Sequence, residues 1–187
     1  MKLSGIASYV LCGVGIALCM GPIFKAWGSN LRYPVAKLKI INQLRTNPNQ
    51  ALGMCKMLPE SFFAALAAAI EAAWMTQSND PTIIQPTTQA TFDAGGQGVS
   101  IKWKMHLMKA KLGVMAGVGG FLLALSVGSG PIIQGICAAL TVAAIVWLFV
   151  VKQEVDASII RARAEILPEV NRVFIEGRYT LPPPNFG

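Results

Sequence analysis

Few side chains in this sequence could do acid–base, nucleophilic or metal chemistry. His106 is the single histidine, and no carboxylate or cysteine stands at a spacing that would make it a catalytic pair. The four cysteines show no CxxC spacing, so the pattern indicates neither metal ligation nor a redox motif. We therefore expect a protein that is not an enzyme and that holds neither a metal ion nor a cofactor.

Two hydroxyl groups are the candidates for an ion path, because they stand inside long apolar stretches. Thr141 falls in Ile132–Val151 and Ser126 in Leu112–Gly128, and neither stretch holds an Asp, Glu, Lys or Arg. An autonomous proton carrier needs an ionisable group inside the membrane. Any ion-coupled role of this chain therefore requires a partner that supplies the charge. The structural alternative for Thr141 is a hydrogen bond back to its own helix.

Three uncharged stretches place these hydroxyls in a membrane. A helix of about 20 apolar residues crosses a hydrocarbon core of about 30 Å. Leu3–Phe24 and Ile132–Val151 are long enough, and Leu112–Gly128 becomes so if the flanking lysines snorkel. The composition agrees, with 53% hydrophobic residues, 13% charged residues and a mean hydropathy of +0.51. We expect an all-α integral membrane protein with three transmembrane helices, in contact with membrane lipid.

The placement of charge indicates how the chain is oriented. The net charge of +7 does not indicate nucleic acid, because the basic residues flank the spans: ten lie in 25–111, against four acidic residues. By the positive-inside rule 25–111 is cytoplasmic, the span 3–24 runs from outside to inside, and the C-terminus is cytoplasmic. A cleaved signal peptide is the rival interpretation of 3–24, but the apolar run is longer than a usual signal core of about 7–15 residues.

The segments between and after the spans differ in composition. Residues 25–76 are expected to form a helical cytoplasmic segment, in which Asn47-Pro48 is a helix start with Asn as N-cap. Residues 77–100 are rich in Gln, Ser, Asn, Pro, Thr and Gly, which predicts a linker. A cytoplasmic helix is expected to run on into the second span over 101–128. The third span, 132–151, is expected to continue as a cytoplasmic helix within 152–187, which ends in a Pro-rich tail.

Small and aromatic residues suggest how the spans pack and where the membrane surface lies. Small residues recur at a spacing that lets helices approach closely, which predicts helix packing in an assembly; they are Gly113, Gly117 and Gly120. Aromatic and basic residues at the ends of spans predict the interface with the headgroups; they are Trp27, Trp103, Lys109 and Lys111.

The layout as a whole resembles the MotA/TolQ/ExbB proton-channel family. The likeness rests on the order of spans and helical segments, on NPNQALGMCKMLPESFFAALAAAIEAAW at 47–74 and on AALTVAAIVWLFVV in the third span. The second span departs from the family's GLLGT-type signature and reads KLGVMAGVGGFLLALSVG. The resemblance implies a homo-oligomeric ring, usually a pentamer, in the bacterial inner membrane. It also implies a pore-facing Thr141 and a single-span partner that carries an intramembrane Asp.

Two functions follow as expectations. The first is a ring-forming subunit of an ion-driven membrane motor or stator, acting with the single-span partner that carries the ion-binding acid. The alternative is a small structural subunit of a multi-protein membrane assembly, such as a secretion, conjugation or energy-converting complex, without channel activity. A membrane enzyme is disfavoured because the spans hold so few polar residues.

The orientation gives the first testable prediction. A cysteine introduced at Ser129, in the turn between the last two spans, should react with a membrane-impermeant thiol reagent added from outside intact cells, because the positive-inside rule places that turn outside. Reaction only after access from the cytoplasm would overturn the orientation. A cysteine at Ser78, in the basic segment, is the matched position that should show the opposite result.

Overall fold

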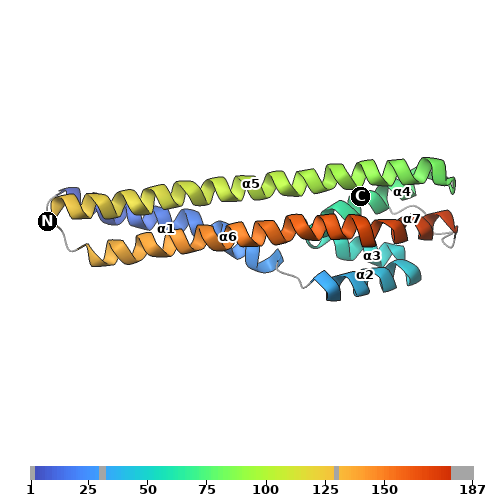
Figure 1. Cartoon of the computed structure of the whole chain (residues 1–187), viewed down its shortest axis with the longest axis horizontal. Helices are drawn as coiled ribbons and strands as arrows, with labels where there is room; N and C mark the ends of the chain where they lie inside the picture. Colours follow the sequence, from blue (N-terminus) through green and yellow to red (C-terminus); the bar gives the residue numbers. More distant parts are fainter. Residues whose placement is uncertain (1–2, 30–32, 129–130, 178–187) are drawn as a thin grey trace. The chain divides into compact units, whose positions relative to one another are not determined.

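The computed structural model describes residues 3–29, 33–128 and 131–177, and its regular elements there are all α-helices (Figure 1). They are α1 (Leu3–Ser29), α2 (Tyr33–Thr46), α3 (Pro48–Lys56), α4 (Phe62–Thr76), α5 (Pro81–Val127), α6 (Ile132–Glu165) and α7 (Leu167–Ile175). The chain divides into two compact units. We call Met1–Asn30 with Trp103–Gln153 the span unit, and Leu31–Lys102 with Glu154–Gly187 the helical unit.

The three predicted spans are confirmed as helices long and apolar enough to cross a membrane. They lie in Gly5–Trp27, in Pro81–Val127 and in Ile132–Ile175, which joins α6 and α7, and the mean hydropathies of their most apolar stretches are 2.0, 1.8 and 2.3. Only 28%, 28% and 22% of the residues in their most apolar stretches are buried within the chain, and the exposed side chains are mainly apolar, as Val10, Leu122 and Val146 show at 58%, 58% and 59% exposure. Such surfaces suit a lipid environment rather than water.

The span unit is held together along one narrow stripe on each helix. On α1 the buried positions recur at alternating intervals of four and three residues; they are Ser8, Cys12, Gly15, Cys19, Pro22 and Ala26. The same spacing on α5 gives Ala110, Gly113, Gly117, Gly120 and Ala124. An average repeat of 3.5 residues is that of helices which pack along a continuous seam. Almost every residue of these two stripes is small.

The helical unit has a conventional apolar core. Its helices α2, α3, α4 and α7, with the first part of α5 and the last part of α6, surround large buried side chains such as Ile40, Leu66 and Ile70. Trp74 meets the ring of Phe174 edge to face, with 5.7 Å between the centroids. This core contrasts with the seam of the span unit, because it is built from bulky side chains.

Local start signals explain where the short helices begin. The predicted N-cap is confirmed: the side chain of Asn47 accepts a hydrogen bond from the backbone of Gln50 at 3.3 Å, and Pro48 opens α3. The next helix, α4, begins at Phe62. The physical reason is that the Ser61 hydroxyl caps the Phe63 amide at 3.3 Å.

The predicted linker at 77–100 is wrong from Pro81 onward, because this stretch is the first part of α5. Asp80 starts the helix: its carboxylate accepts from the Thr82 amide at 2.9 Å, and Pro81 takes the first helical position. At least one of the glycines that suggested a linker, Gly95, instead allows two helices to pack closely. A β-carbon at Gly95 would lie 2.9 Å from the Cα of Ala65, so α5 approaches α4 closely there.

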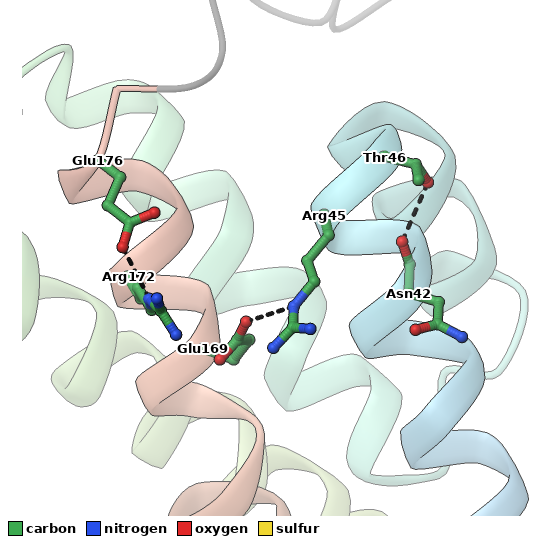
Figure 2. A network of polar contacts seen from close by, with 6 residues as sticks. All are labelled: Asn42, Arg45, Thr46, Glu169, Arg172 and Glu176. Carbon is green, nitrogen blue, oxygen red and sulfur yellow. Dashed lines mark hydrogen bonds and ion pairs between the residues drawn. The ribbon is translucent and has the colours of Figure 1, made fainter.

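The helix α6 ends just before Pro168, which stands in the first turn of α7. α6 runs to Glu165 and α7 carries Pro168 in its first turn. Figure 2 shows how α7 is tied to α2, as Arg45 donates to Glu169 at 2.7 Å. Exposed ion pairs of this kind contribute little each. The Pro-rich tail of the sequence prediction lies outside the described residues.

The two glycines Gly95 and Gly98 give a matched pair of variants in α5. Gly95→Ala should lower the stability of the helical unit by about 1–2 kcal/mol, because the added methyl meets backbone atoms of α4. Gly98→Ala should raise it by about 0.5–1 kcal/mol, because its β-carbon meets nothing within 4 Å and alanine favours a helix. Thermal unfolding of the two purified variants measures both, and equal effects would contradict the close packing of α4 and α5.

Candidate functional site

The glycines predicted for helix packing bring α1 and α5 of the same chain into backbone contact. A β-carbon at Gly15 would lie 2.7 Å from the carbonyl oxygen of Gly113. One at Gly120 would lie 2.8 Å from the carbonyl oxygen of Ser8 and equally close to the Cys12 sulfur. Side chains larger than hydrogen therefore do not fit at these positions. In lipid, where burial of apolar area gives no driving force between helices, such close packing stabilises association.

Two thiol groups of α1 also form hydrogen bonds with α5. The sulfur of Cys12 donates to the carbonyl oxygen of Gly117, and that of Cys19 to the carbonyl oxygen of Ala110, each at 3.8 Å. Both thiols are buried, and they stand seven residues apart on the seam stripe of α1. They act as small, weakly polar packing residues, and their spacing supports one continuous seam.

Thr141, the first ion-path candidate, lies inside this seam. Its side chain is 1% exposed, and its hydroxyl donates to the carbonyl oxygen of Ala138 at 2.8 Å. A β-carbon at Gly117 would lie 2.8 Å from the same hydroxyl oxygen, so Thr141 fills the space that this glycine leaves. The hydroxyl thus has its hydrogen-bond partner within its own helix and contacts α5, with almost no surface for a further group.

Ser126, the second ion-path candidate, is exposed, whereas Thr141 is buried. The Ser126 hydroxyl donates to the carbonyl oxygen of Leu123 at 2.8 Å. The oxygen keeps lone pairs that a group outside the chain can use. The structure therefore does not bring Ser126 and Thr141 together into one path within the chain.

A buried polar pair that the sequence did not predict joins α1 to α6. The side-chain amide of Gln134 donates to the hydroxyl of Ser8 at 3.4 Å, and both residues are fully buried. The carbonyl oxygen of Gln134 has no hydrogen-bond partner. The signal was present in the sequence, because Gln134, Ala138 and Thr141 follow the seam spacing of four and three residues.

Of the four residues predicted to lie at the membrane interface, three are exposed and one is buried. Trp27 is 72% exposed, and Lys109 and Lys111 are exposed as well. Trp103 is fully buried, with its ring 5.9 Å from that of His106 in an edge-to-face contact. Its burial leaves no ring surface for a headgroup, whereas the other three side chains are accessible.

A groove of the helical unit lies between α5 and the α6–α7 segment. Its volume is about 530 Å³, and its described lining includes Gln85, Gln89, Arg163 and Asn171. The carboxylate on its rim, Glu176, is held by Arg172 at 2.7 Å (Figure 2). The polar side chains that line the groove can donate and accept hydrogen bonds, but among the described lining residues no nucleophile is paired with a base.

Perturbed pKa values outside the spans follow from structural contacts. The Lys37 ammonium, 2.8 Å from Glu165, holds the pKa of that carboxyl below its ordinary value, and the Tyr33 hydroxyl also donates to it. A lowered pKa means that this contact helps folding above the ordinary carboxyl pKa and is lost as the pH falls. Burial raises the pKa of the Cys55 thiol to about 12, so it stays protonated at neutral pH.

Among residues 3–29, 33–128 and 131–177, no three His, Cys, Asp or Glu side chains gather in a way that could hold a metal ion. Comparison with protein-family models, with curated protein sequences and with solved structures found no match for this chain. The geometry therefore carries the functional argument alone, and its most distinctive part is the small-residue seam.

Two neighbouring glycines test the seam. Gly120→Ala should lower the thermal midpoint of the detergent-solubilised protein, by an amount that corresponds to about 1–3 kcal/mol, because the methyl meets the Ser8 backbone. Gly119→Ala is the control, since its β-carbon meets nothing within 4 Å. If both variants melt at the same temperature, α1 and α5 do not approach as described.

Proposed function

We propose that this chain is a non-enzymatic membrane subunit that assembles with further copies of itself. The observation that carries the proposal is a second small-residue face on α1, made by Gly13, Ala17 and Gly21. All three residues are exposed, and β-carbons at Gly13 and Gly21 would meet nothing within 4 Å.

This outer face is distinct from the seam. Ala17 follows Gly15 by two residues, which is a rotation of about 200° around the helix. The spacing of four residues between Gly13, Ala17 and Gly21 matches the small-xxx-small pattern at which membrane helices approach each other. The seam already uses the inner stripe of α1 within the chain, so the outer face is available to a neighbouring subunit.

An ion-driven motor or stator is the second candidate, and the uncharged spans favour it over a self-contained carrier. Its single-span partner would bring the acid that the three spans lack. Ser126 supports this candidate, because its hydroxyl lies on an exposed face. Thr141 supports it less, because its hydroxyl is enclosed by the seam. In this form the ring would lie in a bacterial inner membrane with the helical unit on the cytoplasmic side.

The proposal predicts the effect of added bulk on the outer face. Ala17→Leu should reduce the mass of the complex in mild detergent to that of smaller oligomers or single chains, because leucine holds the helices apart. Native mass spectrometry or light scattering measures the mass. Ala7→Leu makes the same substitution at another exposed position of α1, outside the stripe, and should leave the mass unchanged.

The same measurement separates the candidates. A complex of several copies with a small single-span protein favours the motor, and a complex of copies alone favours a structural assembly. If the mass of the wild-type complex corresponds to a single chain, or to one copy of this chain among unlike subunits, the proposed self-assembly is contradicted. An unchanged mass of Ala17→Leu would show that α1 does not form the contact.

A further inference from the structure

The first two turns of α2 expose apolar side chains on the side away from the core, which is unusual for a helix that covers a core. Its inner side contributes Ala36 and Ile40 to the core of the helical unit. On the outer side Val35 and Leu38 are each 64% exposed, and Pro34 beside them is exposed as well. A helix that faced only water would place polar residues there.

The outer side of α2 changes character halfway along the helix. In its last two turns the exposed residues are polar, namely Asn42, Arg45 and Thr46 (Figure 2). Arg45 pairs with Glu169, and the Thr46 hydroxyl donates to the carbonyl oxygen of Asn42 at 3.0 Å. The exposed apolar surface is thus confined to the turns that come first in the chain.

Covalent continuity places those turns near a bilayer surface. The apolar helix α1 ends at Ser29 and α2 begins at Tyr33. Four residue steps reach at most about 14 Å, so the start of α2 stays close to whichever membrane surface α1 leaves. Lys39, which is exposed next to Leu38, adds a positive charge at the edge of the apolar patch.

We propose that the first two turns of α2 lie in the headgroup region of an anionic bilayer. Val35, Leu38 and Pro34 contact the acyl boundary, while Lys39 meets lipid phosphates. An apolar patch with a flanking cation is the pattern of helices that bind membrane surfaces. The polar second half of α2 stays in water. This contact is independent of the proposed self-assembly, because it concerns a different helix and needs a single copy.

Spin-label accessibility in the full-length protein tests the proposal. Val35→Cys and Leu38→Cys are labelled in a background in which the four native cysteines are replaced by alanine, and the protein is placed in vesicles of phosphatidylcholine and phosphatidylglycerol. Both labels should collide more with oxygen, which concentrates in lipid, than with a water-soluble nickel chelate. Asn42→Cys is the matched control on the same side of α2, and its label should show the reverse order.

Every other pattern overturns the proposal. Labels at 35 and 38 that prefer the nickel chelate, as at 42, would show that the patch faces water. Labels shielded from both reagents would show that protein covers it. If dilution with unlabelled protein sharpens their spectra, a second copy is the occupant. The labelled positions themselves are exposed, and circular dichroism of the cysteine-free background and of each labelled variant verifies the fold.

Discussion

The close approach of α1 to α5 is the constraint on which the span unit depends. Apolar burial does not drive helices together inside a bilayer, so shape complementarity has to supply the contact. Gly15, Gly113 and Gly120 remove the side chains that would separate the two backbones, as their distances of 2.7–2.8 Å from a hypothetical β-carbon to a facing carbonyl oxygen show. The thiols of Cys12 and Cys19 fit into the remaining space and bond to α5 carbonyl groups.

This constraint also separates structural from functional surface. The side chain of Thr141 is buried near the middle of the α6 span and fills the space that Gly117 leaves. Its hydroxyl therefore serves packing within the chain. Groups that could meet another chain are left on the outer faces, where Ser126 and the stripe of Gly13, Ala17 and Gly21 lie. The arrangement supports an assembling subunit more directly than a chain that carries ions by itself, and an ion-driven motor built on this chain would need a partner to supply the acid.

Sequence alone predicted the parts of the fold that follow from local rules. Uncharged stretches gave the spans, and Asn47-Pro48 gave the start of α3. The linker prediction failed because it rested on the composition of 77–100 and gave too little weight to Asp80-Pro81 as a helix start. Ile84, Thr88 and Phe92 also repeat at helical spacing in that stretch. The partner of each glycine was beyond prediction, since Gly113 and Gly119 look alike in sequence and only tertiary packing distinguishes them. The pairing of Gln134 could not be predicted for the same reason: it depends on Ser8, which is remote in the chain.

A solid-state NMR contact in lipid bilayers tests the central claim most directly, because it needs no substitution. With ¹³C in Gly15 and ¹⁵N in Gly117 of one chain, the Gly15 Cα and the Gly117 amide nitrogen should show a dipolar contact within about 5 Å, since a β-carbon on Gly15 would lie 2.9 Å from that nitrogen and adds about 1.5 Å. The contact should persist when labelled protein is diluted with unlabelled protein. Its absence, or its loss on dilution, would show that the glycines pack between chains or not at all.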